Sequence, residues 1–194
     1  VAGSVTGALN TKATGAGKSG EVATLSDSFV TVFNADGEEQ WTQRRGARAE
    51  DQATSVAFGA DGVVYIGGRA KSAVTGTTAV GGWDGYVQAF KAGEPYPTAG
   101  IVASSVGQTQ FGTSADDGVD AVAVDGSNLY TAGIENGRAV VRRFTLDAAG
   151  VPTLAATRDL GAISGAIEGV SVSNGRVILT GTSRDSGLSA GTVT

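Results

Sequence analysis

The side chains that could do chemistry in this chain are carboxylates, because the sequence contains no histidine, cysteine or methionine. Two carboxyl groups held about 5 to 9 Å apart can act as the acid and the nucleophile or base of a glycosidase. Alternatively, an acid that recurs before a strand caps a turn by accepting hydrogen bonds from backbone N–H groups. We favour capping, because Asp51, Asp117 and Glu168 recur at similar places, whereas a catalytic pair is asymmetric. The candidate ligand-binding acids are Glu50, Asp51, Asp116, Asp117, Asp120 and Glu168.

The missing residue types exclude several kinds of site. Without cysteine, the chain has no disulfide, no thiol nucleophile and no thiolate metal ligand. Without histidine, most acid–base, zinc and triad chemistry is excluded. We therefore expect a protein that is not an enzyme and that has no catalytic residue, no cofactor and no metal site.

Three stretches look like ligand loops but lack the full pattern. Calcium requires about six to eight oxygen ligands, and neither Asn34–Glu39 nor Ser114–Asp120 supplies enough carboxylates, so we interpret both as turns. Calcium-dependent adhesion stays open as an alternative function. The stretch Gly15–Gly20 carries Gly-Lys-Ser, but a phosphate-binding loop needs a glycine where Lys12 stands. We interpret it as a surface loop.

The charge and the hydropathy of the chain argue against two kinds of partner. The formal net charge is −5, and the basic residues are scattered. Nucleic-acid binding requires a basic stripe that displaces counterions from phosphates. No apolar run approaches the roughly 20 residues that a transmembrane helix needs. We expect neither nucleic-acid binding nor membrane insertion.

Composition favours strands over helices. Glycine accounts for 31 of the 194 residues and proline for only 3, while alanine, threonine, serine and valine are plentiful. Small and β-branched residues with many glycines are typical of short strands joined by tight turns. The predicted fold class is all-β.

Two patterns alternate along the chain. The first is a strand, a tight turn, a second strand and a closing glycine, and it occurs at Ser55–Gly68, Ala121–Gly133 and Val170–Gly181. The second places a valine three residues before a phenylalanine, and it ends at Phe33, Phe90 and Phe144. Glycine, asparagine and aspartate stand where a hairpin turn needs positive φ. One period of about 50 to 65 residues therefore holds four strands, as in a propeller blade.

The best-matching stretch runs from Asp27 to Gly68. It reads Asp-x-Phe-Val-x-x-Phe-x-x-x-Gly-x-x-x-Trp up to Trp41, followed by Ser-Val-Ala-Phe and Gly-Val-Val-Tyr-Ile-Gly-Gly. This run resembles the SBBP-type bacterial β-propeller repeat, in about three copies over most of the chain. The second copy has an insertion at Lys91–Gly100, and the third has Arg138 in place of the leading aspartate. The resemblance implies a partial β-propeller of four-stranded antiparallel blades.

The resemblance also implies an order of strands within a blade. The innermost strand is then Thr54–Phe58, the second Val63–Gly67, the third Gly85–Phe90, and the fourth lies within Ile101–Phe111. The chain divides into the end of one blade, two complete blades and the first half of another, at 1–45, 46–111, 112–160 and 161–194. Because propellers close with at least four blades, we expect closure by the rest of the same chain or by neighbouring subunits.

In this order, the longer and more variable connections share one end of the blades, and variable loops on a rigid scaffold are where recognition usually occurs. Trp83 lies on one of them, either as a platform for a carbohydrate or, as we favour, packed between blades. The predicted function is a non-enzymatic structural or interaction module of a bacterial cell-surface, appendage-associated or secreted protein. It would bind a protein or glycan through these loops, in an extracellular or cell-surface location. The alternative is a carbohydrate-active enzyme that uses Asp/Glu pairs.

Overall fold

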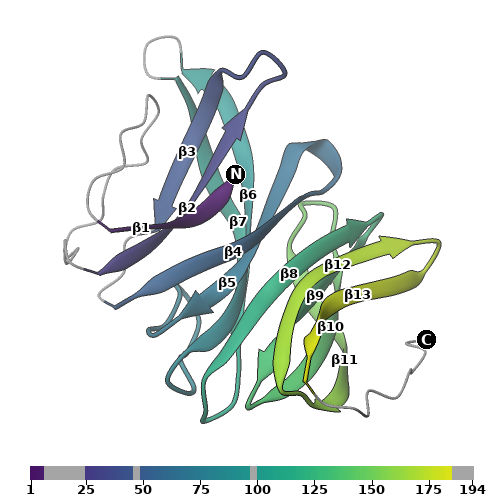
Figure 1. The fold of residues 1–194 in the computed structure, drawn as a ribbon. Coiled ribbons are helices and arrows are strands. Elements are labelled where there is room, and N and C mark those ends of the chain that lie inside the picture. The colour runs from purple at the N-terminus through teal and green to yellow at the C-terminus, as the bar shows by residue number, and fades with distance from the viewer. Residues whose placement is uncertain (7–24, 46–48, 97–99, 185–194) are drawn as a thin grey trace.

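The computed structural model describes residues 1–6, 25–45, 49–96 and 100–184. Within these ranges the chain forms thirteen strands and one short 3-10 turn at Ala60–Gly62, and it contains no α-helix. The strands form four antiparallel sheets (Figure 1). The prediction of an all-β fold is confirmed.

Each sheet is a meander of strands that follow one another in the chain. Sheet 1 contains β1 (Ala2–Thr6), β2 (Ser26–Phe33) and β3 (Glu39–Arg45). Sheet 2 contains β4 (Asp51–Phe58), β5 (Val63–Ala70), β6 (Asp84–Tyr96) and β7 (Gly100–Phe111). Sheet 3 contains β8 (Asp117–Asp125), β9 (Asn128–Glu135), β10 (Arg138–Leu146) and β11 (Pro152–Ala162). Sheet 4 contains β12 (Gly165–Ser173) and β13 (Arg176–Ser183).

Local turn chemistry produces the hairpins that the sequence predicts. Asn174 and Gly175 join β12 to β13 with φ angles of 51° and 71°. Asparagine and glycine tolerate this left-handed region, and a two-residue turn of this kind matches the twist of the flanking strands. The register that follows pairs Ser173 with Arg176 next to the turn.

Apolar side chains fill the spaces between successive sheets. Val30 and Trp41 of sheet 1 pack with Val64 and Phe90 of sheet 2. A second cluster joins sheets 2 and 3, and a third joins sheets 3 and 4. The sheets therefore pack face to face in chain order, and burial of both faces explains the continuous apolar run in β5.

The first strand of each of sheets 2, 3 and 4 contains a β-bulge at the same place. The registers shift around Thr54 in β4, Asp120 in β8 and Glu168 in β12. Opposite these bulges lie the closing glycines of the repeat, which are Gly68, Gly133 and Gly181. A bulge leaves one extra residue unpaired and re-aims its side chain.

In the part of the chain that the structure describes, no helix has the length and apolar character needed to cross a membrane.

Candidate functional site

A pocket of about 250 Å³ opens where sheets 2, 3 and 4 converge. It is lined by residues of four strands and of the segment before β8, which are Arg69, Asp116, Asp117, Gly118, Asp120, Ile134, Gly165 and Ala166. Three of the predicted acids thus lie together. Arg69, which sequence analysis did not single out, provides the cation of the lining.

Asp120 reaches this pocket because it is the bulge residue of β8. The bulge lies between Val119 and Ala121, and Asp120 is half-buried there. Burial raises the pKa of the Asp120 carboxyl above its ordinary value, while the Arg69 charge and a backbone hydrogen bond with Ile134 act in the opposite direction. The protein thus holds a carboxyl group in a pocket that only partly compensates its charge.

Trp83 forms the rim beside the pocket. The Arg69 guanidinium carbon lies 4.6 Å from the Trp83 ring centroid, and the Lys71 ammonium nitrogen lies 4.9 Å from it. Lys71 also forms an ion pair with Glu50. Cations over an indole ring are attracted by the negative face of its π-system. The prediction that Trp83 packs between sheets is wrong, because its ring contacts these cations and stays partly exposed.

Asp116 ties this rim to sheet 3. The backbone N–H of Trp83 donates to Asp116 Oδ1 at 3.1 Å, and the backbone N–H of Asp117 donates to the Trp83 carbonyl oxygen at 2.8 Å. The side chain of Asp116 is exposed. The loop before β6 and the loop before β8 therefore form one surface.

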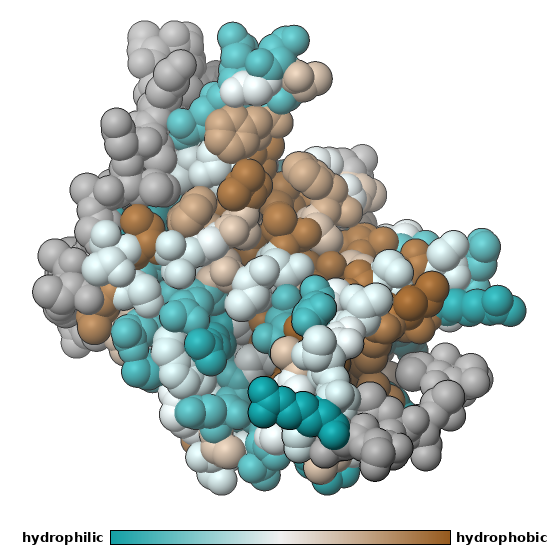
Figure 2. Space-filling view, viewed as in Figure 1, coloured by the Kyte–Doolittle hydropathy of each residue, from teal (hydrophilic) through white to brown (hydrophobic). Residues whose placement is uncertain are grey.

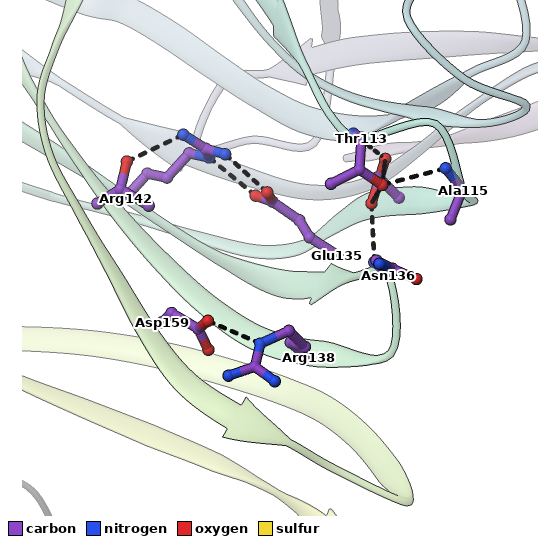
Figure 3. A network of polar contacts seen from close by, with 9 residues as sticks. Thr113, Ala115, Glu135, Asn136, Arg138, Arg142 and Asp159 are labelled. Atoms are coloured by element: carbon purple, nitrogen blue, oxygen red, sulfur yellow. Dashed lines mark hydrogen bonds and ion pairs between the residues drawn. The ribbon is translucent and has the colours of Figure 1, made fainter.

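Asp117 is a capping residue, as predicted. Its Oδ1 accepts a 2.9 Å hydrogen bond from the backbone N–H of Asn136, and its carboxylate also accepts from the backbone N–H and the hydroxyl of Thr113. Thr113 and Asn136 lie close together in Figure 3 for this reason. These bonds occupy both carboxylate oxygens.

Asp51 is buried and joins two sheets. Its Oδ1 accepts a 2.8 Å hydrogen bond from the backbone N–H of Ser28 in sheet 1, and it also accepts from the Ser28 hydroxyl. The carboxylate therefore contributes to the packing of sheets 1 and 2.

Glu168 does not belong to the same set as Asp51 and Asp117, so that predicted equivalence is wrong. Glu168 is exposed and occupies the bulge of β12, which is the position of Asp120 in β8. The residue of sheet 4 that begins the first strand, as Asp51 and Asp117 do, is Gly165.

Two further buried aspartates, Asp27 in β2 and Asp84 in β6, lead the valine–phenylalanine pattern, and sequence analysis did not single them out as site residues. Asp84 is a capping residue. Asp84 accepts hydrogen bonds from the backbone N–H groups of Val80 and Gly81 at 2.7 and 2.9 Å. Asp27 forms an ion pair with Arg44 at 2.5 Å. The signal was present, because both aspartates lead the valine–phenylalanine pattern. Arg138 stands at this place in sheet 3 and pairs with Asp159 at 2.7 Å (Figure 3).

The turn interpretation of Asn34–Glu39 is confirmed. Asn34 Oδ1 accepts hydrogen bonds from the backbone N–H groups of Asp36 and Glu38 at 3.0 and 2.9 Å. Trp41 packs between sheets 1 and 2, with its ring centroid 6.4 Å from that of Phe90. The Gly15–Gly20 stretch lies outside the described residues.

Comparison with known proteins finds one informative similarity. The chain is 36% identical over 202 residues to the regulatory protein FlaEY of Caulobacter vibrioides, an alignment that covers 89% of this chain and 20% of that protein. The similarity is to a regulatory protein. The chain spans about a fifth of the length of this relative. No family model matches the chain.

This finding corrects the predicted function. The assignment to a cell-surface, appendage-associated or secreted structural module is wrong, and so are the alternatives of a carbohydrate-active enzyme or a calcium-dependent adhesion module, because the similar protein is named as a regulator. The descriptions of the chain as a bacterial surface or appendage-associated protein are wrong for the same reason. The SBBP resemblance and the extracellular or cell-surface location stay predictions.

Proposed function

We propose that this chain is a binding segment of a regulatory protein, and that it acts by recognising a partner protein rather than by catalysis. The similarity to a protein named as a regulator supports the first part. The absence of histidine and cysteine from the sequence supports the second.

We also propose that the four sheets are an arc of a β-propeller of the SBBP type. Two observations support this arrangement. The first strands of successive sheets, β4, β8 and β12, lie beside one another (Figure 1). The two four-stranded sheets run in the same order from this first strand to the fourth. The pocket would then lie at the loop end of the blades, next to the inner strands.

The pocket chemistry favours a positively charged group of the partner. Asp116 and Asp120 face one cation, Arg69, and the net charge of the whole chain is −5. Ile134 and Ala166 add apolar surface. A lysine or arginine side chain suits such a site, because its methylene stem packs on apolar surface while its head pairs with carboxylates.

We propose a protein rather than a glycan because of Trp83. Arg69 and Lys71 lie over its ring, where a sugar would stack.

One observation carries the proposal. The bulge of β8 places the half-buried carboxyl of Asp120 in the pocket.

The test is a titration of the isotopically labelled chain with Nα-acetyl-arginine amide, followed by the backbone amide signals. We expect saturable shifts at Gly118, Ala121 and Ala166, and an affinity at least about tenfold lower for Asp120→Asn because a charge-assisted contact is lost. The uncharged analogue Nα-acetyl-citrulline amide should leave these signals in place. Asp36→Asn, which removes the same charge from an exposed turn, is the matched control. Equal shifts with citrulline, or full affinity in Asp120→Asn, would contradict the proposal.

A further inference from the structure

Sheet 4 has a free edge at β13. In the part of the chain that the structure describes, β13 pairs only with β12. The corresponding strands β5 and β9 each pair on both sides, with β4 and β6 and with β8 and β10. A free edge presents backbone N–H and C=O groups that can pair with another strand.

The side chains of β13 are uncovered where their equivalents are buried. With the closing glycines of the repeat aligned, Tyr65, Tyr130 and Ile178 occupy one position, and their exposed fractions are 1%, 9% and 55%. Val64 and Leu129, one residue earlier, are fully buried, whereas Val177 is only half-buried. Figure 2 shows apolar side chains at the surface over β12 and β13.

The covered copies show what a partner of this edge looks like. Phe90 of β6 pairs opposite Val64, and Phe144 of β10 pairs opposite Leu129. Both phenylalanines are buried, and each follows a valine by three residues. The place opposite Val177 therefore suits a phenylalanine on a strand of the same pattern.

We infer that the free edge of β13 binds a further strand with the valine–phenylalanine pattern of β6 and β10, supplied by another part of a longer form of this same protein. The relative supports this source, because four fifths of its length lie outside the alignment with this chain. The segment that follows β13, residues 184–194, has 11 residues. The connection from β5 to β6, residues 71–83, is of similar length, with 13. The inference goes beyond the proposed function and does not depend on what the pocket binds.

The hairpin geometry identifies the backbone groups that report on this pairing. Ser173 and Arg176 form the pair next to the two-residue turn, and in such a hairpin alternate residues point their N–H groups toward the partner strand and away from it. The N–H groups of Val177 and Leu179 therefore point to the free edge, and that of Ile178 points to β12.

The experiment appends a copy of residues 84–111, which contain β6 and β7, after Thr194. Amide hydrogen exchange is then compared with that of the unmodified chain. We expect exchange at Val177 and Leu179 to slow at least about tenfold, with a smaller change at Ile178, because only the outward N–H groups gain acceptors. The matched control carries Val87→Pro and Phe90→Asp in the appended copy alone, and its exchange at Val177 and Leu179 should match that of the unmodified chain.

A second measurement tests the inference even if the extended chain misfolds. The acetylated peptide of residues 84–91 is added to the unmodified chain, and exchange at the same two amides is followed. Absence of protection in both experiments, or equal protection by the control copy, overturns the inference. Protection in the unmodified chain that grows with protein concentration also overturns it, because the partner would then be a second copy. None of these outcomes bears on the Asp120 titration, so the two proposals fail separately.

Discussion

The hydroxyl of Tyr65 in sheet 2 donates a 2.9 Å hydrogen bond to the backbone carbonyl oxygen of Gly150 in sheet 3. The bond is buried and joins residues 85 positions apart in the chain. It lies within the apolar interface between the two sheets, where Tyr65 packs with Leu129 and Phe144. It therefore fixes the turn between β10 and β11 of sheet 3 against β5 of sheet 2.

We predict that Tyr65 makes the stability of the chain sensitive to alkaline pH. Burial, and then the negative charge of Asp147, raise the pKa of the Tyr65 hydroxyl above its ordinary value. The stabilisation is therefore complete below a pH of about 10, where tyrosine titrates in the unfolded chain, and is lost as pH rises through the higher folded pKa.

Denaturant unfolding between pH 7 and 11 checks this prediction. Tyr65→Phe should lose about 1 to 2 kcal/mol at neutral pH, because the Gly150 carbonyl loses its donor, and its stability should fall less steeply above pH 10. Tyr130→Phe, at the equivalent position of sheet 3, is the control. A Tyr65→Phe variant with the same alkaline slope as the wild type would refute the prediction.

Replacement of Gly133 by alanine should destabilise the chain strongly. A Cβ atom on Gly133 would lie 2.0 Å from the carbonyl oxygen of Gly118, because the bulge of β8 brings the two backbones together. The strand has to shift, so we expect a loss of about 3 kcal/mol or more in the free energy of unfolding. Gly126→Asn, at a turn with φ of 56° and open space around it, should cost far less. Similar losses for both variants would mean that the close approach does not matter.

Asp120 should reduce stability at neutral pH, as expected of a charge kept for binding. Burial raises the pKa of the Asp120 carboxyl, so the folded chain favours its protonated form. This contribution to stability is complete below a pH of about 3.9, the pKa in the unfolded chain, and is lost as pH rises through the folded pKa. Asp120→Asn keeps the shape without the charge. The melting temperature of Asp120→Asn minus that of the wild type should increase from pH 3 to pH 7. Asp36→Asn is the control for net charge. A constant difference across this range would contradict the assignment.

Much of the fold could be predicted from the sequence because its signals are local. The strands from Thr54 to Phe58 and from Val63 to Gly67 lie within β4 and β5. The Asn174–Gly175 turn has the dihedral angles that its residue types favour. The alignment of the closing glycines also has a local cause, since each faces a bulge where a Cβ atom has no room.

The grouping of the acids could not be predicted in the same way. A bulge adds one residue to a strand and changes the face to which the following side chains point. Asp120 enters the pocket at such a bulge. Glu168 stands at the equivalent bulge of β12, so it corresponds to Asp120 rather than to Asp117. Trp83 was misplaced because Arg69 comes from the end of β5 and Lys71 from the start of the connection that Trp83 ends, and strand and turn patterns do not specify contacts of this kind.

The sequence by itself determined the repeating hairpins, because turn chemistry and apolar alternation act between residues that are neighbours in the chain. Only the tertiary structure decided which side chains share a pocket. Arg69 comes from β5, Asp120 from β8 and Ala166 from β12, and these strands belong to three different sheets. Their meeting depends on how the sheets pack through buried apolar faces, which no short stretch of sequence specifies.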